Sequence, residues 1–397
     1  MNIAQKILSA LAALTLAMTG CAGNTGTGSP DAKNSVSEET EMELTQKTFA
    51  ADSQHVKMLG RTYSEDGILW LALSASGVEF TMKGTSASVT LAGDSSISTE
   101  ENRARFAAYV DGKRVADEMI VEQEQTVEIF TSEEEKEVTV TLIKLSEAAQ
   151  STVGIKSINV TSVGDIAPTA EKALKIEFIG DSITCGYGVD DEDRNHHFST
   201  ATEDATKAYA YKTAQLLDAD YSLVSYSGHG IVSGYTTQGK KVAAQQVPNM
   251  YEQFARSYGS YNGFSVSGVD WDFSQFVPDF VVINLGTNDA SYTGKDETLI
   301  REYIDGYVKF LGKVRSDNPN AHIICALGVM GQDLCNAVET AVSEYSEQSG
   351  DTNVSAFRLS MQDGNKNGYA ADWHPTAASH DVAAAEMAAE IKRLMAE

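Results

Sequence analysis

From about residue 166 onward, short apolar runs alternate with amphipathic segments, and this alternation constrains the fold more than any other feature of the chain. The apolar runs have the length of buried strands and lie at 176–179, 223–226, 280–285, 323–327 and 354–359. Apolar residues recur at helical spacing over 299–311 and 334–345, and an alanine-rich helix is expected over 376–395. Strands that alternate with helices form a parallel sheet with helices on both faces, so the sequence predicts an α/β domain over 166–397.

Residues 46–165 show a different hydrophobic pattern, in which short runs of alternating apolar and polar residues are separated by turns. These runs lie at 68–73, 77–82, 87–91, 106–110, 125–130 and 137–142. Short strands at close spacing predict an all-β sandwich, here of jelly-roll type. Because this segment holds no constellation of catalytic residue types, we expect it to serve as a packing module that flanks the substrate.

The first 21 residues have the pattern of a bacterial lipoprotein signal peptide. Lys6 is followed by an apolar stretch over 7–18 that is too short to cross a bilayer, and small residues stand directly before Cys21. We expect cleavage before Cys21 and lipidation of its thiol; the alternative is an ordinary secreted protein that is cleaved nearby. Residues 22–45, rich in Gly, Ser, Thr and acidic residues, then form a flexible acidic tether. The predicted location is the outer surface of a bacterial cell, with the lipid as the only contact with the membrane.

The composition excludes some partners. The chain has 397 residues and a formal net charge of −26, and such an acidic surface repels phosphate backbones, so nucleic acid is not an expected partner. Three cysteines remain after Cys21, an odd number that argues against a disulfide framework. One of them, Cys185, lies three residues after Ser182, but nothing beside it marks an activated nucleophile.

Polar residues flanked by glycine follow three of the predicted strands. The first strand leads into Gly180-Asp181-Ser182, the second into Ser227-Gly228-His229-Gly230, and the third into Gly286-Thr287-Asn288-Asp289. A fourth motif, Asp372-Trp373-His374-Pro375, lies in the loop before the final helix. Because the carboxyl ends of parallel strands meet at one edge of a sheet, we expect these residues to form a site there.

The residue types in these motifs meet the needs of serine ester hydrolysis. Ser182 is the predicted nucleophile and His374 the predicted base, because imidazole titrates near neutral pH. Asp372 stands two residues before His374, and in an extended segment two such residues point to the same side, so Asp372 is predicted to orient the imidazole. The backbone N–H groups of Ser182 and Gly230 and the side-chain amide of Asn288 are the predicted oxyanion donors.

Other candidates have weaker support. Tyr187 and Trp373 are predicted to stack against sugar, whereas for Trp271 a place in the core is an equal alternative. Residues 363–368 imitate the start of a calcium loop, but His374 stands where the bidentate glutamate belongs, so a turn is expected. His196 and His197 follow an acidic run in what we expect to be a solvated loop. Neither a metal nor a cofactor is expected.

In this order along the chain, the four motifs resemble those of the SGNH (GDSL-type) hydrolases. The longer strings Gly-Asp-Ser-Ile-Thr-Cys-Gly-Tyr-Gly and Ser-Gly-His-Gly-Ile-Val, behind a β-sandwich, are similar more narrowly to carbohydrate esterase family 2. The resemblance implies a flavodoxin-like three-layer catalytic domain behind a jelly-roll module. It also implies the removal of O-acetyl groups from plant polysaccharides such as xylan and glucomannan, through an acetyl-enzyme.

The same resemblance implies roles for individual residues. Ser182 would be the nucleophile and His374 the base, with Ser182, Gly230 and Asn288 as oxyanion donors. Some members of the family hold the histidine with a backbone carbonyl rather than a carboxylate, so both arrangements stay open for Asp372.

Three other functions remain as alternatives. A lipid or thioester hydrolase on the same scaffold would need a long apolar acyl groove, and an esterase acting on O-acetylated bacterial wall polymers would be chemically close. A glycan-binding protein with a vestigial triad would keep the fold and lose the reaction. The chain has no Gly-x-Ser-x-Gly motif, which argues against the common α/β-hydrolase elbow.

Overall fold

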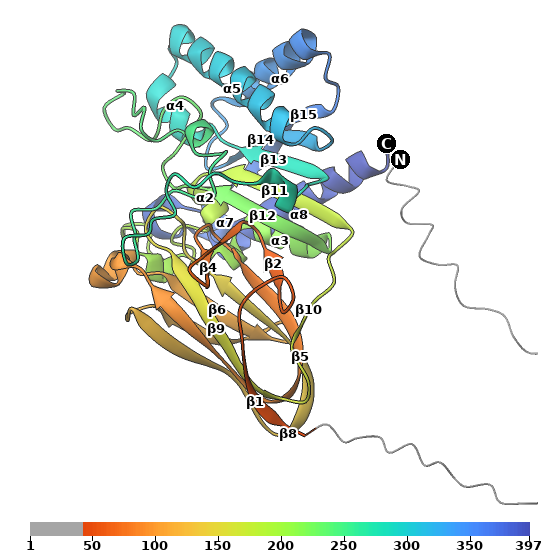
Figure 1. Cartoon of the computed structure of the whole chain (residues 1–397). Helices are drawn as coiled ribbons and strands as arrows, with labels where there is room; N and C mark the ends of the chain where they lie inside the picture. Colours follow the sequence, from red (N-terminus) through yellow and green to blue (C-terminus); the bar gives the residue numbers. More distant parts are fainter. Residues whose placement is uncertain (1–42) are drawn as a thin grey trace, which may run out of the picture.

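The computed structural model describes residues 43–397, in which two β-sheets form the framework (Figure 1). The signal peptide, Cys21 and nearly all of the tether lie outside the described residues. The first sheet is antiparallel, with the strand order β3-β4-β9-β5-β8-β6-β7 and with β1, β2 and β10 paired beside this path. Its strands are β1 Thr45–Phe49, β2 Lys57–Leu59, β3 Thr62–Glu65, β4 Ile68–Leu71, β5 Gly77–Gly93, β6 Arg105–Val110, β7 Lys113–Met119, β8 Glu124–Lys144, β9 Val153–Ser162 and β10 Ala167–Pro168.

This sheet curls around an apolar core and confirms the predicted β-sandwich. Alternate residues of β5, such as Val78, Phe80 and Met82, are buried there, as the period of two in a strand requires. The runs 77–82 and 87–91 were each expected as a strand, yet both belong to β5, which bends through a register shift between Gly84 and Ser86. A Cβ atom on Gly84 would lie 2.1 Å from the carbonyl oxygen of Thr161, so only glycine allows the strands to approach at this bend.

The second sheet is parallel and has the strand order β12-β11-β13-β14-β15. Its strands are β11 Leu174–Gly180, β12 Ala219–Ser225, β13 Phe280–Asn284, β14 His322–Val329 and β15 Val354–Met361. The helices are α2 Ser182–Cys185, α3 Tyr209–Leu216, α4 Thr287–Thr293, α5 Glu297–Asp317, α6 Cys335–Ser349, α7 Gly364–Asn367 and α8 Ala377–Met395. One buried cluster joins α3 and α8 to the sheet, and another joins α5 and α6 to it, so helices cover both faces and the predicted α/β class is confirmed.

The order of the parallel strands determines where a site can form. From β11 the chain passes to β12 on one side and then to β13 on the other, so the direction of winding reverses at β11. Loops at such a reversal diverge and leave a crevice at the carboxyl ends of the strands. The motifs that contain Ser182, Gly228 and Asn288 lie at this edge, after β11, β12 and β13 respectively.

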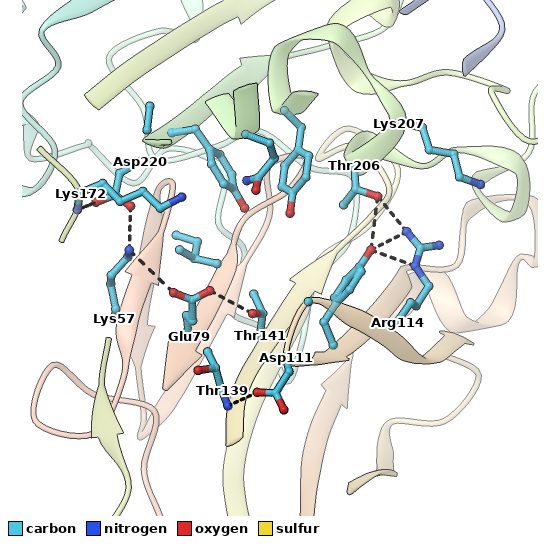
Figure 2. Close-up of a pocket in the computed structure, with 17 residues that line it drawn as sticks. Lys57, Glu79, Asp111, Arg114, Thr139, Thr141, Lys172, Thr206, Lys207 and Asp220 are labelled. Carbon is cyan, nitrogen blue, oxygen red and sulfur yellow. Dashed lines mark hydrogen bonds and ion pairs between the residues drawn. The ribbon is translucent and has the colours of Figure 1, made fainter. Parts of the chain in front are cut away.

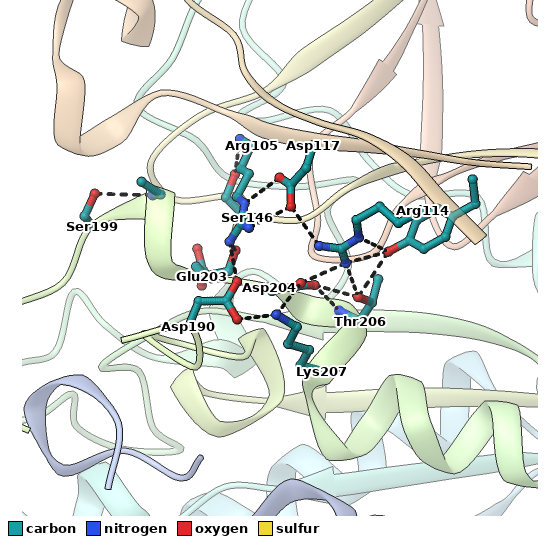
Figure 3. Close-up of polar contacts among 12 residues, drawn as sticks. Arg105, Arg114, Asp117, Ser146, Asp190, Ser199, Glu203, Asp204, Thr206 and Lys207 are labelled. Atoms are coloured by element: carbon teal, nitrogen blue, oxygen red, sulfur yellow. Dashed lines mark hydrogen bonds and ion pairs between the residues drawn. The ribbon is translucent and has the colours of Figure 1, made fainter. Parts of the chain in front are cut away.

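The sandwich and the α/β part are joined by buried and half-buried ion pairs. Arg105 of β6 binds Asp117 and Asp190, each at 2.8 Å, and Arg114 of β7 binds Asp204 at 2.8 Å (Figure 3). Farther along the junction, the fully buried Arg61 binds the Glu177 carboxylate at 3.1 Å. Three of these pairs, Arg105–Asp190, Arg114–Asp204 and Arg61–Glu177, cross the junction between the two parts.

A cavity of about 800 Å³ lies in the same junction, at the amino ends of the parallel strands and therefore away from the edge that holds Ser182 (Figure 2). Lys57 in its wall binds Asp220 at 2.7 Å.

Between residues 43 and 397, no helix combines the length and the apolarity that crossing a bilayer requires.

Candidate active site

Ser182 begins α2 immediately after β11. The Asp181 carboxylate caps this short helix by accepting the Ile183 N–H at 3.0 Å. A Cβ atom on Gly180 would lie 2.0 Å from Thr184 Oγ1, so glycine is needed for the strand to turn this sharply into the helix. As the first residue of the helix, Ser182 presents an N–H that has no acceptor among the described residues.

The structure brings His374 to Ser182 across 192 positions of sequence. His374 Nε2 lies 2.9 Å from Ser182 Oγ, within the range for direct proton transfer. The half-buried imidazole stacks on the ring of Tyr187, with 4.0 Å between the ring centroids. These contacts hold the base against the hydroxyl in the geometry that a serine nucleophile needs.

The group that orients His374 differs from the expected Asp372 carboxylate. His374 Nδ1 lies 3.2 Å from two backbone carbonyl oxygens, those of Ala371 and Asp372, and therefore donates its proton to the main chain. This arrangement leaves Nε2 unprotonated and able to accept the proton of Ser182. Of the two arrangements that the resemblance left open, the backbone carbonyl is the one present.

The Asp372 carboxylate instead accepts the Tyr187 hydroxyl at 2.7 Å and lies 3.1 Å from His197 Nδ1. The expectation failed because the segment is not extended: Asp372 has φ 48° and ψ 36°, and Trp373 has φ 64°. Two successive left-handed residues turn the chain, so the side chains of Asp372 and His374 do not share a side.

The two residues predicted to stack against sugar have different surroundings. The ring of Tyr187 already stacks on His374 and on Phe198, so it supports the base. Trp373 is 49% exposed, and the Arg194 guanidinium lies 4.1 Å from its ring centroid. Of the two residues, only Trp373 keeps a large part of its ring open to solvent, and its predicted contact with sugar stays a prediction. Trp271 is buried in the core.

The predicted oxyanion donors also need one correction. The Gly230 N–H donates to the carbonyl of Gln245 at 3.2 Å and is therefore occupied. Gly228, with φ 75°, lines the cavity beside Ser182, and its N–H meets no acceptor in the part of the chain that is described. Gly228 and Gly230 lie in the same short motif, and their tertiary contacts distinguish them: the N–H of Gly230 binds Gln245, whereas Gly228 faces the cavity.

The Asn288 side chain lies at the cavity wall, as predicted for a donor. Its Nδ2 donates to the carbonyl of His229 at 2.8 Å and lies 3.1 Å from Asp181 Oδ2. A substrate oxygen would share the second N–H with Asp181, whose pKa burial raises to about 7. The cavity thus presents the N–H groups of Ser182 and Gly228, which have no acceptor among the described residues, and the Asn288 amide, whose two N–H groups donate to His229 and Asp181.

Asp289 has a role that the sequence did not reveal. Its buried carboxylate accepts the backbone N–H groups of Ile231, Val232 and Ser233 at 2.9, 2.8 and 3.1 Å. Burial raises its pKa to about 6, and the three N–H groups oppose this shift. The carboxylate thereby ties the loop after β12 to α4, and a glycine-flanked Asn-Asp pair was the only sequence signal.

The wall of the cavity beside Ser182 includes Gly228, Asn288 and His374. Its volume is about 570 Å³, a size common for small-ligand sites. Thr287 of the third motif also lines it, as do Tyr235 and Met330, which no sequence motif identified.

One group of potential metal ligands occurs within residues 43–397. It consists of Glu147, Cys185 and Glu203, whose ligand atoms lie within 4.8 Å of one another. One oxygen of each carboxylate already accepts a backbone N–H, and burial raises the pKa of the Cys185 thiol well above its usual value. A protonated thiol is a poor metal ligand and a poor nucleophile, so Cys185 does not compete with Ser182.

A Ser–His pair with converging N–H donors at the switch point of a parallel sheet defines a serine hydrolase of the SGNH type. Residues 178–382 match the GDSL-like lipase/acylhydrolase family, and residues 58–169 match the N-terminal domain of carbohydrate esterase 2. The chain belongs to carbohydrate esterase family 2 and is an esterase.

Relatives and solved structures agree with this assignment. The cellulase/esterase CelE of Acetivibrio thermocellus is 35% identical over 325 residues, which are 81% of this chain and 37% of the relative, so the chain spans less than half of that protein. An acetylxylan esterase / glucomannan deacetylase of Cellvibrio japonicus is 26% identical over 88% of this chain and 91% of its own length. The structure of a family two carbohydrate esterase from Clostridium thermocellum in complex with cellohexaose matches with a TM-score of 0.74 and 32% identity, covering 86% of this chain and 99% of that chain.

The esterase activity should persist to an unusually low pH. Burial lowers the pKa of His374 to about 4, although the carbonyls of Ala371 and Asp372 oppose the shift. The neutral imidazole is the active base, so kcat/KM for 4-nitrophenyl acetate should stay on its plateau at mildly acidic pH and fall to half only near pH 4. An inflection near the ordinary histidine value of about 6.5, in a protein still folded by circular dichroism, would contradict this.

Asp372→Asn should have a small effect. Because the histidine proton is held by main-chain carbonyls, kcat should fall by less than about tenfold, whereas loss of a true triad carboxylate costs about ten-thousandfold. The asparagine oxygen still accepts the Tyr187 hydroxyl. Steady-state kinetics on 4-nitrophenyl acetate tests this, and a loss of triad size would show that the carboxylate acts on the imidazole directly.

Proposed function

We propose that this esterase removes O-acetyl groups from plant polysaccharides such as xylan or glucomannan. The observation that carries the proposal is the 2.9 Å contact between Ser182 Oγ and His374 Nε2 within a cavity of about 570 Å³. The names of the relatives support the substrate class, since one is an acetylxylan esterase / glucomannan deacetylase.

In the first half of the reaction, Ser182 Oγ attacks the acetyl carbonyl carbon while His374 Nε2 takes the hydroxyl proton. The carbonyl oxygen becomes an oxyanion, which the N–H groups of Ser182 and Gly228 and the Asn288 amide stabilise. The C–O bond to the sugar then breaks, and His374 returns the proton to the leaving sugar oxygen. The product of this half is a sugar hydroxyl and an acetyl ester on Ser182.

In the second half, water replaces the sugar. His374 takes a proton from the water as its oxygen attacks the acetyl-enzyme, and the same donors hold the second oxyanion. Collapse of this intermediate breaks the bond to Ser182 Oγ, which recovers its proton from His374, and acetate leaves.

Aromatic side chains at the cavity suit a sugar substrate. Trp373 and Tyr235 are 49% and 58% exposed, and both line the cavity that contains Ser182. Broad apolar ring faces can contact the C–H face of a sugar, while the acetyl group enters toward Ser182. The solved structure of the Clostridium thermocellum relative holds cellohexaose, a neutral glucan.

Acetate release from acetylated xylan and acetylated glucomannan, measured for wild type beside Ser182→Ala, tests the substrate. Release by wild type that disappears in the variant would support the proposal and rank the two polymers. Cleavage of 4-nitrophenyl acetate without release from either polymer would overturn the plant-polymer substrate and leave the esterase in place.

We also propose that the mature enzyme is anchored to the outer surface of a bacterial cell by lipid on Cys21. The support is the sequence of residues 1–21 alone. Expression in a bacterial host, followed by membrane fractionation, should recover wild type with membranes and Cys21→Ala in the soluble fraction. Recovery of both in the soluble fraction would overturn the anchor.

A further inference from the structure

A glutamate of the N-terminal part reaches beneath the catalytic edge. Glu147 follows the end of β8, and its side chain is 1% exposed. Its Oε2 accepts the backbone N–H of Ser227 at 2.8 Å. Ser227 lies 80 residues later, in the loop after β12, and directly precedes Gly228.

Glu147 is itself held from several sides. Its backbone N–H donates to Glu203 Oε2 at 2.8 Å, and its carbonyl accepts Lys144 Nζ at 2.9 Å. Lys144 is fully buried and also donates to the Ser146 carbonyl at 2.6 Å. Glu203 and Ser146 both belong to the polar junction between the sandwich and the α/β part (Figure 3). The main chain of Glu147 is thus held on both sides, so its buried side chain has little freedom to move away from Ser227.

The contact with Ser227 bears on the oxyanion donor at Gly228. The Gly228 N–H belongs to the peptide group between Ser227 and Gly228. On one side of this peptide, Glu147 holds the Ser227 N–H; on the other, the Gly228 carbonyl accepts the Tyr235 N–H at 2.8 Å. Gly228 has φ 75°, a conformation that glycine permits but does not enforce. Within the peptide group itself, the Ser227 carbonyl accepts His229 Nδ1 at 2.8 Å. This hydrogen bond and the two flanking ones together hold the orientation of the donor.

We propose that Glu147, contributed by the β-sandwich part, is a positioning residue that aims the Gly228 N–H at the oxyanion. The proposal rests on the assignment of Ser182 and His374 to ester hydrolysis. Donors that are aligned before the reaction stabilise the developing charge without reorganisation. A misdirected donor therefore reduces the stabilisation of the transition state more than it reduces the binding of the substrate.

The test compares Glu147→Leu with Glu147→Gln in the full chain. Leucine has a similar size and no acceptor, whereas glutamine keeps an amide oxygen for the Ser227 N–H. Removing an oxyanion donor costs about a hundredfold to a thousandfold in kcat, so a misdirected one should cost about tenfold to a hundredfold in Glu147→Leu, with KM for 4-nitrophenyl acetate nearly unchanged. Glu147→Gln should recover most of the rate.

A matched control separates positioning from loss of stability. Arg114→Met removes ion pairs of the same junction, including the pair with Asp204, without touching the loop of Ser227. It should lower the melting temperature and leave kcat at 25 °C unchanged. Glu147→Leu with normal kcat, or Glu147→Gln as impaired as Glu147→Leu while both remain folded, would overturn the proposal. All these rates are compared with wild-type cleavage of 4-nitrophenyl acetate. The result therefore stands even if the enzyme releases no acetate from either polysaccharide.

Discussion

Replacing Ser182 with alanine is expected to lower kcat for 4-nitrophenyl acetate by at least about ten-thousandfold. The hydroxyl is the atom that forms the acetyl-enzyme, and the described residues place no other activated nucleophile at this edge: the nearby Cys185 thiol is buried, and burial raises its pKa. Steady-state kinetics and mass spectrometry of the trapped acetyl-enzyme measure the effect, and the variant should show no acetyl adduct.

The alanine variant should remain folded, since it loses a single hydroxyl whose partner is His374. An unchanged melting temperature would show that the lost rate is chemical. Substantial turnover by Ser182→Ala, or an adduct that forms on another residue, would contradict the assignment of the nucleophile.

Replacing His374 with glutamine should cost a similar factor, about ten-thousandfold in kcat. Glutamine fills much of the space against Tyr187 but cannot accept the proton of Ser182. The residual rate should rise with pH, because hydroxide then replaces the missing base, and the inflection near pH 4 should vanish.

His197 offers a matched histidine control. Its side chain is 93% exposed, and it lies 3.1 Å from the Asp372 carboxylate without touching Ser182. His197→Gln should therefore keep wild-type kcat. A comparable loss in both histidine variants would indicate that the loop around Asp372, rather than the base, had been disturbed.

The nucleophile and the base in these predictions lie beside elements that short stretches of sequence indicate. The apolar runs that lie in β11, β13 and β14 are local signals, because a buried parallel strand is mostly apolar; the buried Glu177 of β11 is a charged exception. The helical spacing over 299–311 likewise lies within α5. Ser182 follows the first of these strands by two residues, so its place at the carboxyl edge follows from local pattern and from the general geometry of parallel sheets.

Sequence reasoning failed where a nonlocal contact decides between neighbouring residues. Asp372 was expected to turn its carboxylate toward His374, but packing against Tyr187 and His197 accompanies a left-handed turn that presents the backbone carbonyl instead. Gly230 was expected to present its N–H to the oxyanion, but that N–H donates to the carbonyl of Gln245, and Gly228 lines the cavity instead. The local pattern also predicted two strands, at 77–82 and 87–91, where the structure has the single strand β5. Pairing with β8 on one side and β9 on the other keeps this strand continuous through its bend.

The sequence by itself determined the two fold classes, their order along the chain, and the nucleophile and base, because apolar periodicity and glycine-flanked polar residues are properties of short segments. Only the tertiary structure decided how His374 is oriented, which glycine presents its N–H to the cavity, and that Glu147 of the sandwich part supports the loop that carries this glycine. Each of these depends on hydrogen bonds between segments far apart in the chain, and a hydrogen bond requires distances and angles that no local pattern contains.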